Sequence, residues 1–407
     1  MVTSSYPRFP GDAIATFMEP IARGVADLGH AVHVVAPWHP EWRRPLSEGR
    51  LSFHLYRYAP AARLCVFGYA GALRADVRLR ASAVAVAPLA MAAGAWRARQ
   101  VARQTDATLI HAHWVIPGGV QAAAAAGGRP LVISLHGSDV YVAERHRAAS
   151  MAARAAFRRA AWVTACSADL QRRAIALGAP PDRTTVVPYG VASDRFRPDA
   201  GMRARGRSRI GVDPSAPLVL AFGRLVEKKG FEYLIDATAL LRRMRPDLHG
   251  LRVAIAGEGD LGPALQAHAA EAGVGEFVRF PGVMPHQDMP DLVAAADVAV
   301  VPSIRDEAGN VDGLPNTVLE IMASATPLVA TRAGGIGAVA TDGVTAQLVP
   351  EKDPDALAGA IARLLADPPL AADMGQRARE LVCRDYSWTR VATEFECVYE
   401  RVLAGAG

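Results

Sequence analysis

The sequence lacks most features that mark secreted, membrane-spanning or metal-cluster proteins. Its four cysteines form no C-x-x-C pair, which argues against a zinc site or a disulfide framework and predicts reduced thiols in a cytoplasmic protein. The N-terminus shows no basic region followed by an apolar core and a cleavage site, so no secretory signal is predicted. The longest uncharged stretch of the basic region, residues 81–96, is interrupted by Pro88 and is short for a membrane span. It is expected to form a buried or interfacial helix.

Two common nucleotide-binding loops are also missing. The chain contains no G-x-x-x-x-G-K-[ST] loop, and no G-x-G-x-x-G fingerprint follows a strand in the context that it requires. These absences disfavour phosphate-loop NTPases and nicotinamide-dependent dehydrogenases. His111 and His113 would face the same side of a strand, but no third metal ligand stands at a fitting spacing. No metal ligand is therefore predicted.

Lysine is scarce, and the arginines are unevenly placed. Residues 1–199 contain 24 arginines, no lysine and 13 acids, a net charge of +11, which leaves −6 for the remainder of a chain whose total is +5. The densest stretch, residues 57–103, has the single acid Asp76 and these arginines: Arg57, Arg63, Arg74, Arg78, Arg80, Arg97, Arg99 and Arg103. Docking on anionic lipid, binding of an anionic acceptor and ordinary solvated charges all stay open. Nucleic acid is disfavoured, because no aromatic platform or binding motif accompanies the arginines.

The order of apolar segments predicts the fold class. A chain of 407 residues that is 51% hydrophobic can bury large cores and is expected to form two or three domains. Apolar, β-rich runs lie at residues 30–37, 107–114, 130–137, 161–167 and 184–190. Helical periodicity separates most of them, and after an Arg-rich segment the alternation resumes with LVLAFGR, LRVAIAG, EFVRFPG, VAVVPS and TPLVAT. This pattern predicts an α/β protein of two doubly wound, Rossmann-like domains joined near residue 200, with the ligand in the crevice between them.

A candidate phosphate site lies in residues 221–235. A strand is expected to end at Gly223 and a helix to begin near Gly230, with Arg224 and Lys229 in the loop between them. Two cations at the carboxyl end of a parallel strand suit a diphosphate, because they would stabilise the charge that develops on a leaving phosphate. The alternative interpretation is a surface loop whose charges pair with nearby glutamates.

A second candidate site lies in residues 306–330, where Asp312 and Glu320 stand eight positions apart around a Gly-Leu-Pro-Asn turn. Pro315 suits the first position of a helix. The backbone N–H groups of Asn316, Thr317 and Val318 would then face an anion, and the helix dipole would favour its binding. With Asp312 placed for sugar hydroxyls and Glu320 for a ribose diol, the pattern indicates a nucleotide sugar. The alternative is a capped helix with ordinary surface acids.

The chain resembles the retaining glycosyltransferases of family 4, also called group 1, which have the GT-B fold. The signature runs from Asp312 and Glu320 into IMASATPLVATRAGGIGAVATDGVTAQLV. In the first half of the chain, SSYPRFPGD resembles the N-terminal glycine loop of the family, and IHAHWVIPGG and ISLHGSDVY resemble its acceptor-domain strand ends. Further on, VVPYGVASDRFRP resembles the domain junction, GRLVEKKG resembles the donor-phosphate loop, and DYSWTRVATEFECVYERVL resembles the closing helix. The resemblance implies an acceptor-binding domain in residues 1–199 facing a nucleotide-sugar-binding domain in residues 200–385 across a cleft. It also implies a helix in residues 386–407 that packs back on the first domain.

The resemblance further implies sugar transfer from a nucleoside diphosphate sugar to a hydroxyl acceptor, with retention at the anomeric carbon and no metal or other cofactor. The departing phosphate would take the acceptor proton, so no dedicated protein base is expected. Carried over residue by residue, the catalytic group is His136, Asp312 and Glu320. The donor-binding group is Gly11, Gly223, Arg224, Lys229, Val283, Asn316, Thr317 and Glu320.

Two departures from the family pattern keep an alternative open. The first acid of the motif is usually Glu, so Asp312 is one methylene shorter, and Ala325 replaces the usual Gly of EAMA-x-G-x-P. A catalytically weak or inactive sugar-nucleotide-binding scaffold would keep the fold and tolerate both changes. A GT-B epimerase or phosphorylase would also keep the domains, but a phosphorylase needs a pyridoxal phosphate lysine, and lysine is scarce here.

The expected biological setting rests on composition and family alone. A basic N-terminal domain favours cell-surface polysaccharide or glycolipid synthesis, with a lipid-linked or saccharide acceptor. The expected location is cytoplasmic and peripheral on the inner face of the cell membrane, held there by the Arg-rich stretch.

Overall fold

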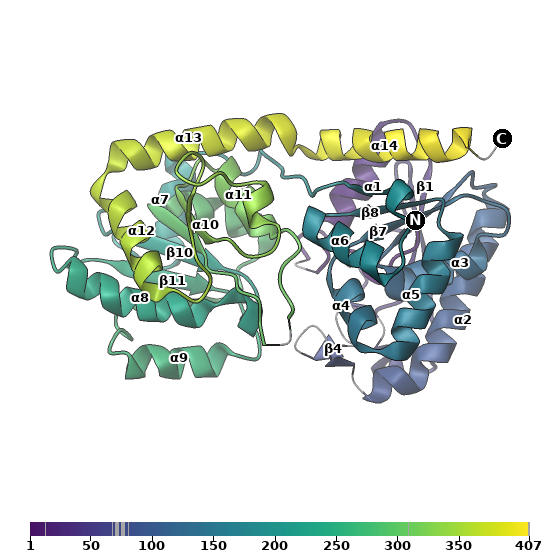
Figure 1. Cartoon of the computed structure of the whole chain (residues 1–407), viewed down its shortest axis with the longest axis horizontal. Coiled ribbons are helices and arrows are strands. Elements are labelled where there is room, and N and C mark those ends of the chain that lie inside the picture. Colours follow the sequence, from purple (N-terminus) through teal and green to yellow (C-terminus); the bar gives the residue numbers. More distant parts are fainter. Residues whose placement is uncertain are drawn as a thin grey trace. The chain divides into compact units, whose positions relative to one another are not determined.

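The computed structural model describes residues 1–12, 14–66, 68–69, 73–74, 78–79, 81–307 and 309–405, and divides the chain into two compact units (Figure 1). Unit 1 consists of Met1–Tyr189 together with Trp388–Gly407, and unit 2 of Gly190–Ser387. The sequence places the division near residue 200, and the structure places it between Tyr189 and Gly190. Each unit is an α/β fold on a mainly parallel sheet, which confirms the predicted fold class.

The sheet of unit 1 is built from short strands. They are β1 (Val32–Pro37), β2 (Ser47–Glu48), β3 (Leu51–Tyr56), β6 (Ile110–His113), β7 (Leu131–Leu135), β8 (Trp162–Ala165) and β9 (Thr184–Val186). Strands β6, β7, β8 and β9 are parallel neighbours in that order, β1 pairs in parallel with β3, and β2 is antiparallel to β3. Val2 forms parallel bridges with Val35 and Ala112 and so joins the two sets. A separate antiparallel pair consists of β4 (Leu73–Arg74) and β5 (Arg78–Leu79).

The helices of unit 1 follow most of its strands. They are α1 (Met18–Asp27), α2 (Ala81–Gln104), α3 (Val120–Ala125), α4 (Ser138–Arg145), α5 (Arg147–Arg159), α6 (Ala168–Leu177) and α14 (Trp388–Ala404). Although α14 is the last helix of the chain, it packs on α1. The approach is close, because a Cβ added to Gly24 would lie 2.8 Å from the Cβ of Ala392. Only glycine therefore fits this position of α1.

Unit 2 repeats the pattern with a sheet that is parallel throughout its described strands. The strands are β10 (Leu218–Phe222), β11 (Arg252–Ala256), β12 (Val278–Gly282), β13 (Val298–Val301), β14 (Leu328–Thr331) and β15 (Gln347–Val349), in the spatial order β12-β11-β10-β13-β14-β15. The helices are α7 (Ala200–Arg209), α8 (Phe231–Met244), α9 (Gly262–Glu271), α10 (Met289–Ala295), α11 (Asn316–Ala323), α12 (Pro354–Ala366) and α13 (Pro368–Asp385). The order reverses between β10 and β13, which makes their carboxyl ends the expected place for a ligand.

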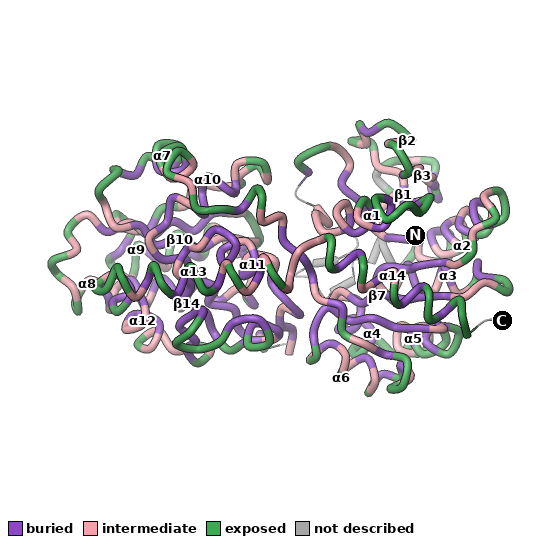
Figure 2. Tube along the Cα trace, turned by 90° about the horizontal axis from the view of Figure 1, so that it is seen from above, coloured by how far each residue is buried: buried purple, intermediate pink, exposed green. Residues whose placement is uncertain are grey.

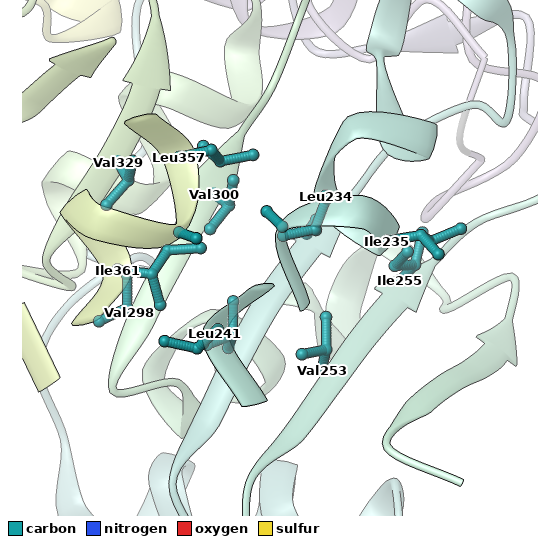
Figure 3. Packing of buried hydrophobic residues seen from close by; sticks show 14 of the residues in the cluster. Leu234, Ile235, Leu241, Val253, Ile255, Val298, Val300, Val329, Leu357 and Ile361 are labelled. Atoms are coloured by element: carbon teal, nitrogen blue, oxygen red, sulfur yellow. The ribbon is translucent and has the colours of Figure 1, made fainter. Parts of the chain in front are cut away.

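One hydrophobic core of unit 2 lies between the sheet and the helices on one of its faces. Leu234 and Leu241 of α8 meet Leu357 and Ile361 of α12 over the valines of the central strands (Figure 3). These side chains are almost wholly removed from water, and each large aliphatic group stabilises the fold by about 1.5–3 kcal/mol. The apolar periodicity of α8 and α12 in the sequence thus corresponds to one packed interface.

Burial explains why most strands could be predicted. Figure 2 shows buried positions gathered along the strands and exposed ones on the outer sides of the helices. Strand β7 is buried at every position, so it reads as a continuous apolar run. Five of the described strands were not predicted. Strands β2, β4 and β5 have two residues each and β15 has three, while β3 places Ser52 and His54 between its apolar residues and so lacks a continuous apolar run.

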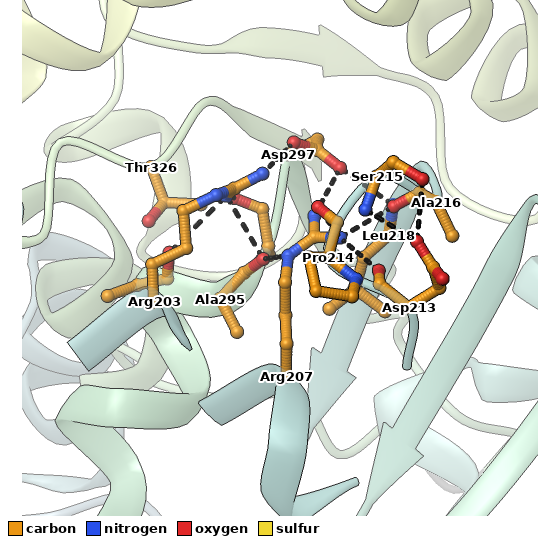
Figure 4. A network of polar contacts seen from close by, with 12 residues as sticks. Arg203, Arg207, Asp213, Pro214, Ser215, Ala216, Leu218, Ala295, Asp297 and Thr326 are labelled. Carbon is orange, nitrogen blue, oxygen red and sulfur yellow. Dashed lines mark hydrogen bonds and ion pairs between the residues drawn. The ribbon is translucent and has the colours of Figure 1, made fainter. Parts of the chain in front are cut away.

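A buried arginine fastens α7 to the sheet of unit 2 (Figure 4). The Arg207 guanidinium donates to the carbonyl oxygens of Ala295, Asp213, Pro214 and Ala216 at 2.7–3.1 Å. It also contacts Asp297 at 2.8 Å, and the same carboxylate accepts from the Leu218 N–H at 2.8 Å. Arg207 therefore satisfies loop carbonyls and fixes the starts of β10 and β13 together.

The Arg-rich stretch is only partly described. Arg80 lies outside the described residues, as do the side chains of Arg63, Arg74 and Arg78. Residues 81–96 do form a helix, within α2, and Leu89 and Trp96 on it are 59% and 66% exposed. In the part of the chain that the structure describes, no helix combines the length and hydropathy that crossing a membrane requires.

Candidate active site

The loop between β10 and α8, here called the lysine loop, contains Lys228 and Lys229 and is held against the segment that follows β13. After β10, a single 3-10 turn, Glu227–Lys229, ends at Gly230, whose φ is +61°. A Cβ on Gly230 would lie 2.1 Å from the Pro302 carbonyl oxygen, so only glycine fits. The Ile304 N–H also donates to the Lys228 carbonyl at 2.8 Å. The loops after β10 and β13 are therefore one packed layer at the carboxyl edge of the sheet.

Asp312 and two lysines form the charged centre of this layer. Its Oδ2 accepts from Lys229 Nζ at 2.6 Å, and its Oδ1 lies 3.0 Å from Lys228 Nζ. The three side chains are between 11% and 14% exposed, so the ion pairs are largely shielded from water. Lys229 pairs with Asp312 rather than with a nearby glutamate, so the alternative interpretation of the loop does not describe this lysine.

The ion pairs determine the charge of Asp312. Burial by itself would raise the pKa of this carboxyl group, but the Lys228 and Lys229 ammonium groups outweigh burial and hold the pKa well below its ordinary value. Asp312 is thus an anion at neutral pH, and two cations face it. The pair of lysines leaves one positive charge in excess at this point of the site.

Buried polar atoms without partners occur at the start of α11 and after β13. Asn316 Oδ1 and Thr317 Oγ1 in the first turn of α11, and Ser303 Oγ after β13, are buried and have no hydrogen-bond partner among the described residues. Buried polar groups normally have partners, so these atoms suit a polar ligand. Two details of the prediction are wrong: Pro315 is the residue before the helix, and the Val318 N–H is not free, since it donates to the Pro315 carbonyl at 3.0 Å.

Glu320 lies in the second turn of α11, as its position in the sequence predicts. Burial raises the pKa of this carboxyl group to about 7, although Arg195 and Lys229 act in the opposite direction. Its carboxyl group is therefore near the midpoint of its titration at neutral pH. A group with this property beside cations and unpaired polar atoms is typical of a functional site.

The other residues predicted to bind the donor lie in unit 2, except for Gly11. Gly223 follows β10, and a Cβ on it would be 3.8 Å from Lys229 Nζ, so the ammonium lies against it. Arg224 is exposed in the same loop, and Val283, after β12, is 52% exposed. Gly11 belongs to unit 1, in an exposed turn beside Asp12, which accepts from Arg8. Lys229, Asp312, Asn316, Thr317 and Glu320 are brought to one edge of one sheet.

His136 stands in a second polar cluster, at the carboxyl ends of the strands of unit 1. Its Nδ1 lies 2.8 Å from Tyr189 Oη and its Nε2 lies 3.1 Å from His113 Nδ1. Burial lowers the pKa of His136 to about 3, so the ring is neutral at neutral pH. The carboxylate of Asp139 accepts from the backbone N–H groups of Val115, His136 and Gly137 at 2.7–3.3 Å and so fixes the loop that carries His136.

Three residues of these clusters were missed from the sequence: Lys228, Tyr189 and Ser303. Lys228 is the first lysine of the KK pair, and only its neighbour was assigned a role. Tyr189 stands in VVPYG, after β9, and Ser303 in VVPS, after β13. The available signal was a polar residue directly after each apolar run, at the edge where ligands bind in open parallel sheets.

Metal ligation finds no support in the described side chains. Among those residues, no three or more His, Cys, Asp or Glu are arranged to hold an ion. His111 and His113, which share a face of β6, are engaged in other ways. His111 hydrogen-bonds Tyr399 and Ser134 at 2.7 and 2.6 Å, and His113 contacts His136.

Comparison with known proteins covers both units. Residues 203–381 match the family described as glycosyl transferases group 1, and residues 14–195 match the family described as Glycosyltransferase Family 4. The GDP-mannose-dependent alpha-(1-6)-phosphatidylinositol monomannoside mannosyltransferase of Mycolicibacterium smegmatis is 38% identical over 270 residues, 65% of this chain and 68% of that protein. The alpha-D-kanosaminyltransferase of Streptomyces kanamyceticus is 33% identical over 290 residues, 68% of this chain and 71% of that protein.

The fold also has close counterparts among solved structures. Sucrose-phosphate synthase from Thermosynechococcus elongatus superposes with a TM-score of 0.77 at 19% sequence identity, and the match covers 99% of each chain. At this identity the likeness concerns the fold alone. It extends over both units, so neither lacks a counterpart in that structure.

Proposed function

Because this chain belongs to the group 1 glycosyltransferases, glycosyltransferase family 4, we propose that it transfers a sugar from a nucleoside diphosphate sugar to a hydroxyl acceptor with retention at the anomeric carbon. The observation that carries the proposal is the Lys228–Asp312–Lys229 cluster beside the unpaired polar atoms at the start of α11. That cluster offers positive charge and hydrogen-bonding groups at the edge of the sheet where a nucleotide would bind.

The donor would engage unit 2 through its charged parts. Its diphosphate would contact Arg224, Lys229 and the first turn of α11, where the helix dipole favours an anion. Glu320 would accept hydrogen bonds from the ribose diol, and Asp312 from hydroxyls of the sugar. Support comes from the geometry of the free site, in which Lys228 can keep Asp312 ionised while Lys229 turns to a phosphate. Gly223, Val283, Asn316 and Thr317 complete the proposed donor set, with Gly11 in unit 1.

The chemistry would rest on electrostatic stabilisation rather than on a protein base. As the bond to the phosphate breaks, negative charge develops on the leaving group, and fixed ammonium and guanidinium groups stabilise it without reorganisation. The departing phosphate would take the acceptor proton. These cations supply the charge that a divalent ion supplies elsewhere, so no cofactor is needed beyond the nucleotide sugar. His136 would line the site for the reacting sugar.

The acceptor is proposed to be saccharide or lipid-linked, in cell-surface polysaccharide or glycolipid synthesis. One face of α2 supports contact with an anionic membrane. Leu89 and Trp96 project from it, and Arg99 and Arg103 follow at helical spacing, so apolar and cationic groups share a side. The protein would then act in the cytoplasm, peripheral to the inner face of the membrane.

A panel of nucleotide sugars tests the proposal. GDP-mannose, which the name of the mycobacterial relative specifies, is the first donor, and UDP-glucose and UDP-N-acetylglucosamine follow. Release of nucleoside diphosphate, transfer to added acceptors and anomeric configuration of the product by NMR are measured, with and without excess chelator. Turnover that persists in chelator with a retained anomer is the expected result. Binding of a donor without any turnover would favour the inactive scaffold, which Asp312 in place of the usual Glu suggests.

A further inference from the structure

Three polar aromatic side chains meet at one edge of the sheet of unit 1. His113 ends β6, His136 follows β7, and Tyr189 comes three residues after the end of β9. The strands are parallel and β6 pairs with β7, with His113 opposite Ser134. Residues far apart in the sequence are thereby placed next to one another, with two hydrogen bonds between them: His113 Nδ1 to His136 Nε2 at 3.1 Å, and His136 Nδ1 to Tyr189 Oη at 2.8 Å.

The surroundings hold the three rings in place. The ring of His136 is nearly parallel to those of His113 and Tyr189, at interplanar angles of 15° and 4°. The Phe17 ring packs on His136 and Tyr189 at 4.7 and 4.8 Å between centroids. Behind His113, His111 lies 4.2 Å away, fixed by Tyr399 and Ser134. Rotation of any one ring would break contacts on two sides.

Burial determines how many protons the imidazole rings of His113 and His136 carry. His113 is wholly buried and its pKa lies well below the ordinary value because its charged form would be desolvated, and the same cause acts on His136. A neutral imidazole carries one N–H and one bare nitrogen. In the contact between the two rings, the hydrogen is therefore either on His113 Nδ1 or on His136 Nε2. In the first case His136 carries its own hydrogen on Nδ1, and in the second case its Nδ1 is bare.

The free nitrogen of His113 decides the direction. His113 Nε2 is buried and has no hydrogen-bond partner among the described residues. A buried N–H without an acceptor is rarer than a buried acceptor without a donor, so Nε2 is the bare nitrogen and the proton is on Nδ1. His113 then donates to His136 Nε2. His136 carries its own proton on Nδ1 and donates it to Tyr189 Oη.

We propose that His113 is a positioning residue for sugar transfer, which holds His136 as the Nδ1–H tautomer between His113 and Tyr189. This inference rests on the proposed function and deepens it. Both ring nitrogens of His136 are engaged inside unit 1, so His136 meets the reacting sugar as a neutral, oriented ring and neither accepts nor releases a proton during transfer. His113 touches no substrate and acts only through His136.

The tautomer can be measured without a substrate. The protein is labelled with 15N at histidine, and the His136 signals are assigned by their loss in His136→Gln. We expect a protonated Nδ1 and a bare Nε2 in the wild type, the same in His113→Asn, whose side-chain amide can donate to Nε2, and a mixture in His113→Leu. A proton on Nε2 of wild-type His136 overturns the inference.

Kinetics separate positioning from a structural role. His113→Leu should lower kcat about 10- to 100-fold with little change in the donor KM, because a misplaced group near the reacting atoms costs about that much. His113→Asn should restore kcat to within about threefold. Equal kcat losses in both variants, with equal losses of thermal stability, would make His113 merely structural. If the wild type transfers no sugar, the proposed function is wrong, and the NMR spectrum still decides the tautomer of His136. If the wild type is active but His136 has the opposite tautomer, only the positioning role of His113 is wrong.

Discussion

At the scale of single residues, the chain has only three lysines, and the one outside the proposed site can serve as a control for substitutions within it. Two of its three lysines, Lys228 and Lys229, contact Asp312, and the third, Lys352, is exposed in a turn after β15. Lys229→Ala is expected to lower transfer activity about 30- to 1000-fold, because a lost charged contact to a shielded phosphate costs about 2–4 kcal/mol. Glu320→Ala should have an effect of similar size through the ribose. Steady-state kinetics on folded protein measure both.

Lys352→Ala is the matched control and should leave kcat and KM unchanged. Circular dichroism and thermal melts confirm that each variant is folded before its rates are compared. Near-normal turnover of a folded Lys229→Ala protein would contradict the assignment of Lys229 to the donor phosphates. A loss shared equally by Lys352→Ala would point to a general effect of charge instead.

Glu320 gives a pH-dependent prediction. Its pKa is raised from 4.5 to about 7, so the folded protein binds this proton more tightly than the unfolded chain does. The resulting stabilisation is complete below about pH 4.5 and is lost as the pH rises through about 7. Donor binding should change in the opposite direction, because the ionised carboxylate is the stronger acceptor for ribose hydroxyls. Affinity measured by calorimetry between pH 5.5 and 8.5 should therefore rise with pH.

Glu320→Gln removes the titration and keeps the shape of the side chain. Its donor affinity should be lower at high pH and nearly flat across the same range. The free energy of unfolding of the wild type should decline between about pH 4.5 and 7, and that of Glu320→Gln should not. If the wild-type and Glu320→Gln profiles run parallel, another group is responsible for the pH dependence.

At the scale of elements, the packing of the lysine loop depends on one glycine. Gly230 has φ +61°, and a Cβ there would meet the Pro302 carbonyl at 2.1 Å. Gly273, after α9, has φ +70° but no atom within 4 Å of an added Cβ. Gly273→Ala should cost about 1 kcal/mol for the backbone conformation alone. Gly230→Ala should cost about 1–3 kcal/mol more, because the loop must also move.

Urea denaturation of both variants measures the difference. The movement in Gly230→Ala should also displace Lys229, so transfer activity should fall in this variant and not in Gly273→Ala. Equal losses of stability would mean that the loops after β10 and β13 are not packed as described here.

The anchoring of α7 gives a second test at this scale. Arg207→Met leaves four carbonyl groups and part of Asp297 without their donor, and should destabilise unit 2 by about 2–4 kcal/mol. Arg209 on the same helix makes one exposed pair with Asp288, so Arg209→Met should cost at most about 1 kcal/mol. Chemical denaturation compares the two. A cost for Arg207→Met no larger than that for Arg209→Met would show that the network contributes little.

At the scale of the whole molecule, the proposed membrane contact can be tested by vesicle co-sedimentation. The protein should bind anionic and not neutral vesicles, and binding should weaken as salt is raised, because surface charges are screened over about 8 Å at physiological ionic strength. Trp96→Ser combined with Leu89→Ser should reduce binding about 10-fold or more, since these exposed side chains would enter the interface. Val344→Ser, at a 41% exposed position of unit 2, is the control. Absence of binding even at low salt would favour a soluble acceptor.

The sequence by itself determined the fold class and most of the longer elements. Buried parallel strands must be apolar along most of their length, so β7 and β10 are visible as uninterrupted runs. The spacing of Asp312 and Glu320 around the start of α11 is likewise local, because a helix converts sequence separation directly into position. Short or polar strands such as β15 and β3 carry no such signal, and their formation depends on the neighbours that they pair with.

Only the tertiary structure decided which polar groups meet. The carboxylate of Asp312 is shared by Lys228 and Lys229, 84 and 83 positions earlier in the chain, and His136 lies between His113 and Tyr189, 23 and 53 positions away. No periodicity links such residues, since each pair depends on where separate strands end at a common edge of a sheet. The resulting shifts in pKa of Asp312 and Glu320 depend on burial and on neighbouring charge, which arise only when the whole unit has folded.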